Sequence, residues 1–594
     1  MSLFNPDIQQ EFLKRKLLQN EINQIDVYFS ELMAKLSKTS DTELIKTFAE
    51  LSYRISQQDS CLEVSDKLAA KLHKLETVTE LSDDNMNQSN TPLILAGNKL
   101  YLQKYFQYET KIARDLIKRN VIIENSDFKS LELLFPKNLK DNDDIDWQKV
   151  AAFQCLSRQL TIITGGPGTG KTTTIVKILA ALLDQNPDLR IKLAAPTGKA
   201  AAKLSESIAS SVNSLPELLN AEIPDDVSTV HRLLGMRNKG HAYRYHQDNK
   251  MSVDLLVLDE ASMIDLVMFT RILEALPDDC RLIILGDPEQ LLSVDVGAVL
   301  TDLFRLGQSY TEEYQNLMND TLGYEMLASS IEDHPLCNTL CHLRTSYRFN
   351  PELGIGNLAA SIRENVELDF INDDEVNYVQ VFKQNSLKTA LVNQYQAYFD
   401  LIREKANAST LLNKFEETRV LSPLREGEFG IESLNDIIES SLYQHQSVPI
   451  FYHGKAIMVT QNDYVLELFN GDIGICFESS EGELKVAFHD QDAGIREIPL
   501  IRLPSWETCF VMSVHKSQGS EFQNVSLVIP PIQHYTRNIF TRELIYTAVT
   551  RAKSHVTIYA RPKDLLSCLA QSSNRLSGLQ ERFNMEWHAQ ETSP

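Results

Sequence analysis

The chain has 594 residues, of which 43% are hydrophobic and 23% charged, and its formal net charge at pH 7 is −23. These proportions are ordinary for a soluble globular protein, and no apolar run reaches membrane-spanning length. Because one core seldom exceeds about 250 to 300 residues, we expect three or four domains. Eight cysteines without a disulfide-like spacing, and no secretory signal in MSLFNPDIQQ, predict a cytoplasmic protein with reduced thiols.

The first 120 residues predict a mainly helical domain. Apolar residues recur near helical spacing between residue 3 and about 75, at Ile8, Phe12, Ile22, Ile25, Phe29, Leu32 and Leu36. The short apolar runs 93–95 and 100–102 flank Gly97-Asn98, which predicts a β-hairpin. Because this region carries no catalytic constellation, it either docks a partner or simply packs on the rest of the chain.

A complete phosphate-binding loop follows an expected buried strand at 161–164. The loop comprises Gly165, Gly166, Pro167, Gly168, Thr169, Gly170, Lys171 and Thr172, and Thr173 continues into an expected helix. Its glycines let backbone N–H groups surround a phosphate, Lys171 reaches the β- and γ-phosphates, and the Thr172 hydroxyl binds Mg²⁺. We therefore expect the chain to bind a nucleoside triphosphate.

Two more apolar strands end in polar residues. The run 255–258 ends in Asp259, placed to hold Mg²⁺ through its water shell, and Glu260, placed to deprotonate the attacking water. The run 282–285 leads into GDPEQL, where the amide of Gln290 can sense the γ-phosphate. An acidic pair alone is often a helix start, and Asp-Pro alone a turn. The three signals in this order predict one RecA-like α/β domain with a parallel sheet.

The sequence changes character between about 448 and 504. Short β-like runs alternate there with turn signals at 470–472 and 481–483, which predicts a small β insertion. The strand and helix pattern resumes at Thr508 with VHKSQGSEF at 514–522, an apolar strand at 525–529 and YTAVTRA at 546–552. These later motifs predict a second motor domain.

GGPGTGKTTT, APTGKAA, VLDEAS, GDPEQL, VHKSQGSEF and YTAVTRA occur in the order found in superfamily 1 DNA helicases. Within that group the chain resembles the RecD family, the alpha subunits of RecBCD enzymes (exonuclease V), most densely from about Trp147 to Ala560. LRTSYRF at 343–349 and FNGDIG at 469–474 add to the likeness. The resemblance implies two RecA-like parallel-sheet motor domains, an N-terminal mainly helical domain and an SH3-like β insertion.

The expected domains are 1–120 for partner docking, 121–345 for the first motor domain and 346–594 for the second. The first motor domain carries a small hairpin near 235–254, and the second carries the SH3-like insertion near 448–504. By resemblance the hairpin splits or steers DNA strands, and the alternative is a plain surface hairpin.

The resemblance also assigns roles to single residues. Gln148 would contact the adenine, with a solvated helix residue as the alternative, and Glu521 would also bind the nucleotide. Arg348 and Arg551 would reach the γ-phosphate as arginine fingers when the two motor domains close. The expected DNA contacts are Pro196, Thr197, Lys199, Thr229, His231, His515 and Lys516. For Thr229 a helix N-cap is the alternative.

The implied function is an ATP- and Mg²⁺-dependent 5′ to 3′ single-stranded DNA translocase and helicase for double-strand break repair and recombination. Its partners would be DNA ends and RecB-like and RecC-like subunits in a heterotrimer, without a membrane. The charge of −23 predicts weak DNA binding by the isolated chain. A stand-alone RecD-like helicase would usually carry helix-hairpin-helix elements, which are not evident before residue 120. A regulatory nucleotide-binding module is a second alternative, and a nuclease is disfavoured because no acid-x-acid-x-Lys constellation follows the motor.

Overall fold

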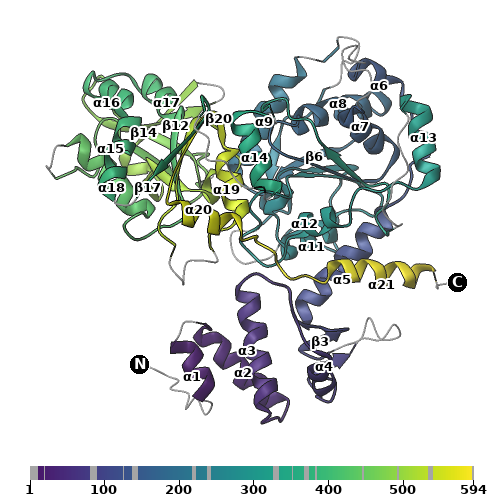
Figure 1. The fold of residues 1–594 in the computed structure, drawn as a ribbon. Helices are drawn as coiled ribbons and strands as arrows, with labels where there is room; N and C mark the ends of the chain where they lie inside the picture. The colour runs from purple at the N-terminus through teal and green to yellow at the C-terminus, as the bar shows by residue number, and fades with distance from the viewer. Residues whose placement is uncertain are drawn as a thin grey trace.

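Two parallel α/β sheets dominate the computed structural model of the chain, and an N-terminal lobe lies beside them (Figure 1). The structure describes all residues except 1–10, 19–20, 81–89, 125, 137–144, 214, 217–221, 237–242, 325–333, 351, 365, 367–372, 382–383, 444–446, 464, 491–493, 533–538 and 592–594.

The first large sheet has six strands in the order β10-β5-β9-β8-β6-β7, all in parallel pairs. The strands are β5 Leu160–Gly165, β6 Ile191–Ala195, β7 Val227–Thr229, β8 Leu255–Leu258, β9 Arg281–Gly286 and β10 Leu340–Leu343. They are rich in aliphatic residues because both faces are covered. One core packs α6 Lys129–Leu134, α7 Trp147–Ser157, α8 Lys171–Gln185, α9 Gly198–Val212 and α13 Glu312–Leu322. The other packs α10 Val230–Leu233, α11 Leu266–Ala275 and α12 Val299–Arg305.

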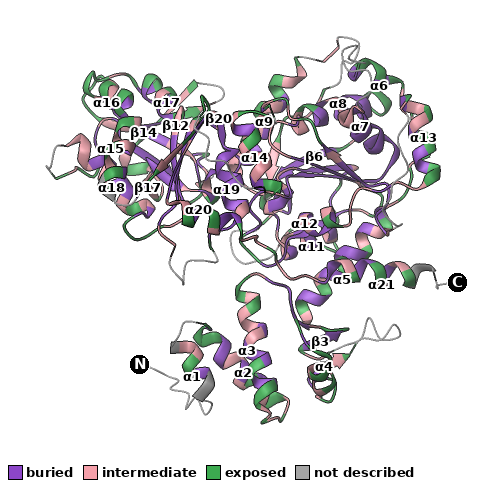
Figure 2. Cartoon of the chain, in the orientation of Figure 1, coloured by how far each residue is buried: buried purple, intermediate pink, exposed green. Residues whose placement is uncertain are grey.

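The second large sheet has the order β11-β20-β19-β12-β18 and is also parallel throughout. Its strands are β11 Val376–Gln380, β12 Thr418–Ser422, β18 Val511–Ser513, β19 Phe522–Val528 and β20 Ala552–Ala560. One core contains α14 Gly354–Glu364, α19 Arg542–Val549 and α20 Pro562–Leu569. The opposite core contains α15 Gln384–Gln394, α16 Gln396–Arg403, α17 Ala408–Glu416 and α18 Ile431–Leu442. The α/β class with two parallel sheets is thus confirmed, and Figure 2 shows the buried residues concentrated in these strands.

A five-stranded antiparallel sheet interrupts the second α/β unit between α18 and β18. Its order is β16-β15-β14-β13-β17, formed by β13 Ala456–Val459, β14 Ile473–Glu478, β15 Leu484–Asp490, β16 Gly494–Pro499 and β17 Trp506–Thr508. The β character expected near 448–504 is therefore confirmed. The described pairings form an open order of strands, so the SH3-like class stays a prediction.

The N-terminal lobe combines helices with a sheet of order β1-β4-β3-β2. Its elements are α1 Glu11–Leu18, α2 Gln24–Leu36, α3 Thr42–Ser56, β1 Cys61–Glu63, α4 Asp66–Leu72, β2 Val78–Glu80, β3 Leu93–Ala96, β4 Lys99–Leu102 and α5 Gln103–Arg119. The β3–β4 pair is antiparallel around Gly97, which confirms the predicted hairpin. Residues 3–10 of the predicted helical region lie outside the described part of the chain.

The last helix, α21 Leu579–Glu591, lies apart from the second large sheet and packs on α5 (Figure 1). Its Leu579 and Phe583 belong to the core that covers one face of the first sheet. The sequence-based range 346–594 includes this helix, because its spacing gave no sign of where it packs. The described structure places it with the first α/β unit instead.

All eight cysteines are buried and free, as their spacing indicates. In the described part of the chain, no helix has the length and apolar content to cross a membrane.

Candidate active site

The phosphate-binding loop connects β5 to α8 at the carboxyl edge of the first sheet. Gly168 and Gly170 adopt left-handed backbone angles, φ +77° and +78°, and Gly170 is the N-cap of α8. A Cβ at Gly168 would also collide with the Cβ of Arg348. Glycine is therefore needed at Gly168 for both its angle and its space.

Lys171 turns back into this loop. Its Nζ donates to the carbonyls of Gly165 at 2.6 Å and Gly166 at 3.1 Å, while the Thr169 hydroxyl donates to Gly166 O at 2.9 Å. Thr172 follows Lys171 in the first turn of α8, where unpaired backbone N–H groups favour an anion. The arrangement fits a triphosphate held by Lys171 and the helix N-terminus.

The carboxylates Asp259 and Glu260 follow β8 directly. Glu260 has φ +50°, and its N–H donates to Asp259 Oδ1 at 2.8 Å. A left-handed angle costs a non-glycine residue of the order of 1 kcal/mol or more, so the surroundings fix this backbone. Burial, and next the charge of Glu260, raise the pKa of Asp259 to about 6, while the Lys171 charge opposes that rise.

Gln290 lies in a hydrogen-bonded cluster that spans both α/β units. Its Nε2 donates to Asp287 Oδ2 at 3.0 Å, and its Oε1 accepts from Arg551 Nη2 at 2.6 Å. Tyr546 OH also donates to Asp287 Oδ2, at 3.3 Å. Burial raises the pKa of Asp287. The structure therefore brings together Gln290 and Arg551, two residues predicted separately from sequence.

Arg551 is only 3% exposed and has further donors in use. Its Nε donates to Thr547 O at 3.1 Å and its Nη1 to Ser520 O at 3.3 Å. The planar guanidinium thus joins α19, the loop before β19 and Gln290 in one fixed geometry.

Arg348 lies over the phosphate-binding loop and pairs with Glu521. The N–H of Tyr347 donates to Gly168 O at 2.8 Å, and Arg348 Nη2 donates to Glu521 Oε1 at 2.8 Å. Arg348 Nη1 is buried and has no hydrogen-bond partner among the described residues. Glu521 was predicted to bind nucleotide, and here it accepts from this arginine.

Lys203 of α9 also pairs with Glu521, and the sequence did not identify it as a site residue. Its Nζ lies 2.6 Å from Glu521 Oε1. Burial opposes ionisation of Glu521, but the charges of Lys203 and Arg348 outweigh it and hold the pKa of Glu521 at about 2. Lys203 follows Lys199 by four positions on one helix, so it shares a face with a residue already predicted as functional.

Gln148 lies in the first turn of α7, which Asp146 caps by accepting from the N–H groups of Gln148 and Lys149 at 3.0 and 3.3 Å. The side chain of Gln148 donates to Thr169 O at 3.0 Å. It is half-buried against the phosphate-binding loop, unlike a solvated helix residue. Contact with adenine stays a prediction.

Four of the predicted DNA contacts meet at the carboxyl edge of β6 and β7. Thr229 pairs in register with Ala195, the residue before Pro196. Thr197 caps α9 by accepting from the Ala200 N–H at 3.2 Å, and Thr229 caps α10 by accepting from the Arg232 N–H at 3.3 Å. The N-cap alternative for Thr229 is thus present, and the DNA role remains a prediction for Pro196, Thr197, Lys199 and Thr229.

Lys199 points toward the second α/β unit. Its Nζ lies 6.0 Å from the centre of the Phe522 ring. Burial, and next the charge of Arg419, lower the pKa of Lys199 to about 8. A Cβ at the neighbouring Gly198 would lie 2.9 Å from Phe469 Cβ, so the start of α9 lies against the loop between β13 and β14 of the antiparallel sheet. This contact joins the predicted DNA loop to the β insertion.

The other predicted DNA contacts lie in two places. His231 faces Tyr243 with 6.5 Å between the ring centres, and Met236 pairs with Tyr243 at the base of the predicted hairpin. The segment 237–242 of that hairpin is outside the described residues. His515 and Lys516 form a 3₁₀ turn, and Lys516 Nζ lies 2.8 Å from Glu507 Oε1.

Known proteins resemble the chain over this site and beyond it. An AAA domain model (AAA_19) matches residues 148–296, and a UvrD-like helicase C-terminal domain model (UvrD_C_2) matches residues 508–559. "RecBCD enzyme subunit RecD" of Haemophilus influenzae is 33% identical over 94% of this chain and 97% of its own length.

Two further relatives are more distant. "RecBCD enzyme subunit RecD" of Buchnera aphidicola is 30% identical over 82% of this chain and 84% of its own. "ATP-dependent RecD2 DNA helicase" of Deinococcus radiodurans is 26% identical over 81% of this chain and 58% of its own. The site agrees with this similarity over nearly the whole length, since it has the loop that holds Lys171, the carboxylates after β8 and the cluster across the two α/β units. The chain belongs to the RecD family of DNA helicases.

Proposed function

We propose that this ATP-dependent DNA helicase moves 5′ to 3′ along single-stranded DNA and unwinds duplex ahead of it, as the alpha subunit of a RecBCD-type complex in double-strand break repair. The hydrogen bond between Gln290 and Arg551, at 2.6 Å, is the observation that best supports a motor. It links the expected γ-phosphate sensor of one α/β unit to an arginine of the other. Closure of the two units can then depend on the nucleotide.

The polar groups at the loop fit Mg²⁺ bound beside the triphosphate. Mg²⁺ commonly takes one or two protein oxygens and completes its shell with phosphates and water. Thr172 and Asp259 offer a hydroxyl and a carboxylate, and the described residues contain no group of three His, Cys, Asp or Glu side chains that would hold a metal alone. When bound, Mg²⁺ would neutralise charge on the phosphates.

Four side chains of the site have separate roles in ATP hydrolysis. Glu260 takes the proton of the attacking water, and Lys171 binds the β- and γ-phosphates. Arg348 and Arg551 stabilise the charge that spreads over the γ-phosphate oxygens in the transition state. The buried Arg348 Nη1 supports this role, since it has a donor to offer.

The loops that we expect to contact DNA belong to the same two α/β units that open and close. Gly198 lies against Phe469, so the loop of Thr197 and Lys199 lies next to the second unit. Opening and closing of the units would change this contact, and alternating grip on the strand would advance the DNA. The isolated chain would bind DNA weakly because its charge is −23.

We predict that translocation runs toward the 3′ end. A streptavidin block bound at either end of a single strand measures the direction. With ATP, the chain or its complex should displace a block only from the 3′ end, and Lys171→Gln serves as the inactive control. Displacement only from the 5′ end would contradict the proposed polarity.

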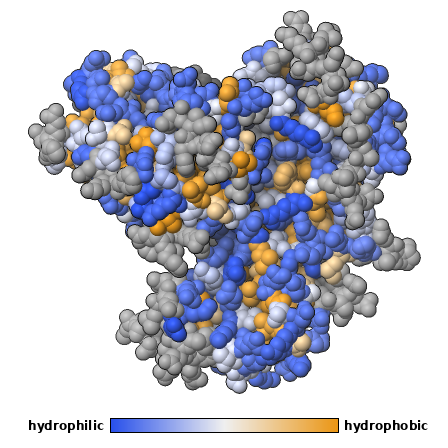
Figure 3. All heavy atoms as spheres, viewed as in Figure 1, coloured by the Kyte–Doolittle hydropathy of each residue, from blue (hydrophilic) through white to orange (hydrophobic). Residues whose placement is uncertain are grey.

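We assign the N-terminal lobe to docking on the RecC-like subunit of the complex. Ile25, Leu32 and Leu36 of α2 are 67%, 54% and 49% exposed, at spacings that place them near one face. The opposite face, with Val27 and Met33, is buried. Figure 3 shows hydrophobic side chains among polar ones at the surface of this lobe. Exposed apolar stripes of this kind favour a protein contact.

The docking prediction is tested with Ile25→Asp/Leu32→Asp. The double variant should reduce co-purification with the RecC-like chain at least about tenfold, because two charges would be buried at the interface. The ATPase rate should stay unchanged, and Ile501→Asp, at a side chain 95% exposed in the β insertion, is the matched control.

Point substitutions are preferable to a deletion of residues 1 to about 115. Ile112 and Ala113 of α5 belong to the core of the first motor unit, so that deletion would damage the motor. Unchanged co-purification of Ile25→Asp/Leu32→Asp would place the docking surface elsewhere.

A further inference from the structure

The segment 571–578 joins three parts of the chain on its way from α20 to α21. At its start, the Arg542 N–H donates to Gln571 O at 2.7 Å, and Ser572 Oγ and Ser573 N donate to Glu543 at 2.7 and 2.9 Å. Arg542 and Glu543 are in the first turn of α19, the helix that leads to Arg551. The segment is therefore attached to the arginine-finger helix.

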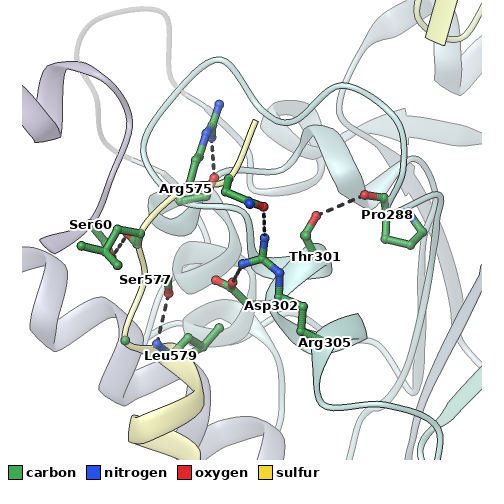
Figure 4. A network of polar contacts seen from close by, with 12 residues as sticks. Ser60, Pro288, Thr301, Asp302, Arg305, Arg575, Ser577 and Leu579 are labelled. Atoms are coloured by element: carbon green, nitrogen blue, oxygen red, sulfur yellow. Dashed lines mark hydrogen bonds and ion pairs between the residues drawn. The ribbon is translucent and has the colours of Figure 1, made fainter. Parts of the chain in front are cut away.

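Farther along, the same segment is attached to the N-terminal lobe. The Leu576 N–H donates to Asp59 Oδ1 at 2.7 Å, and the Ser60 N–H donates to Leu576 O at 3.0 Å. The buried carboxylate of Glu109 on α5 accepts from Ser60 Oγ at 2.5 Å and from Ser577 Oγ at 3.2 Å. Figure 4 shows this crossing beside α12.

Arg575 lies in the middle of the segment and holds a loop of the first motor unit. Its Nη1 donates to Ser293 Oγ at 2.9 Å, Asp295 O at 2.7 Å and Gly297 O at 2.6 Å. Its Nη2 donates to Ser293 O and, at 2.5 Å, to Gln58 Oε1 of the N-terminal lobe. The Gly297 N–H in turn donates to Gln58 O at 3.0 Å. One guanidinium thus ties the 293–297 loop to Gln58, two residues after the end of α3.

The loop that Arg575 holds begins three residues after Gln290. Between them, the backbone of Leu291 is held on both sides. Its N–H donates to Thr547 Oγ1 at 2.9 Å, and its carbonyl oxygen accepts from Gln518 Nε2 at 3.1 Å. Ser293 is 3% exposed. Only Leu291 and Leu292 separate Gln290 from Ser293, so a shift of the 293–297 loop would reach Gln290 through this short stretch of backbone.

The charge on Arg575 strengthens the hydrogen bonds that hold the 293–297 loop. Burial lowers its pKa to about 10, and the largest opposing influence is the charge of Asp59. The guanidinium therefore stays charged at neutral pH, and hydrogen bonds from a charged donor are stronger than those from a neutral one. Lysine has no planar fork to reach three carbonyls and an amide at once.

We propose that Arg575 is a positioning residue for ATP hydrolysis, which holds the 293–297 loop against Gln58 and so fixes Gln290 at the γ-phosphate. The proposal rests on the sensing role proposed above for Gln290. It also makes the N-terminal lobe part of the support of the ATP site. Arg575 itself is not expected to touch the nucleotide.

The test measures the DNA-stimulated ATPase of the full chain over a range of ATP concentrations. Arg575→Gln should lower kcat about tenfold and leave KM for ATP within about twofold, since binding does not depend on the loop. Arg305→Gln is the matched control, because Arg305 Nη2 donates to Asn574 Oδ1 at 2.7 Å in the same segment but is not bonded to the 293–297 loop.

A double-mutant cycle separates positioning from general damage. If Arg575 acts through Gln290, adding Arg575→Gln to Gln290→Ala should lower kcat no further than Gln290→Ala alone. Multiplied effects, or a full kcat in Arg575→Gln, would overturn the proposal. A full kcat in Gln290→Ala would overturn its premise, while loss of turnover in Lys171→Gln would still support the ATPase.

Gln58→Ala provides a milder variant that keeps the arginine. It removes one of the bonds of Arg575 and should lower kcat about threefold, with melting close to that of the unaltered chain. If Arg575→Gln does not fold, this variant decides: a lowered kcat supports the proposal, and an unchanged kcat overturns it.

Discussion

Lys171→Gln is expected to lower the ATPase kcat by about 100-fold or more, the usual cost of removing a charge that stabilises the transition state. The residue lies in a loop, where its Nζ bonds only to the carbonyls of Gly165 and Gly166 among the described contacts. The strand and helix that frame the loop keep their buried residues in the variant. Thermal melting should therefore stay close to that of the unaltered chain.

Lys192→Gln is the control for Lys171→Gln, because Lys192 is an exposed lysine of β6 in the same unit. It should hydrolyse ATP at the full rate. Activity of Lys171→Gln above about a tenth of the unaltered chain would contradict the role given to this lysine.

Arg551→Ala should lower kcat by about 1,000-fold, the lower end of the effect of an arginine finger, and should keep ATP binding. The arginine acts when the two units close, so its loss destabilises the transition state more than it weakens the binding of nucleotide. Arg348→Ala should act in the same direction. Initial binding is measured with a fluorescent ATP analogue, and turnover is measured at saturating ATP.

The burial of Arg551 requires a second variant. Arg551→Ala leaves Gln290 Oε1 without its donor, which costs about 1 to 3 kcal/mol of stability. Arg551→Lys keeps a charge in place and should melt closer to the unaltered chain, yet should remain slow. Arg561→Ala, in a pair with Asp564 away from the cluster, is the control. Full turnover with weakened ATP affinity would show that Arg551 is not a finger.

The parts of the site that sequence could predict are local in the chain. The loop around Lys171 has glycines where φ is positive, and buried strands precede both it and Asp259. Strand, loop and helix are encoded there by neighbouring residues, so spacing alone reveals them. The hairpin around Gly97 was predicted for the same reason.

The contacts between distant residues could not be predicted in this way. Gln290 and Arg551 are 261 positions apart, and no periodicity indicates that their side chains meet. The pairing of Lys203 with Glu521 likewise depends on how the two sheets face each other. Arg575 and helix α21 carry no motif, because backbone carbonyls and a shared core determine where they lie.

The ATPase rate of the isolated chain, measured with and without single-stranded DNA, shows whether this chain couples ATP hydrolysis to DNA. A motor whose DNA loops and ATP site share the two units must couple DNA binding to ATP hydrolysis, so we expect DNA to raise kcat about tenfold or more at low salt. Lys171→Gln should stay at about a hundredth of the unaltered rate or below under either condition. A regulatory nucleotide-binding module would show the same rate with and without DNA, and that result would contradict a DNA-coupled motor.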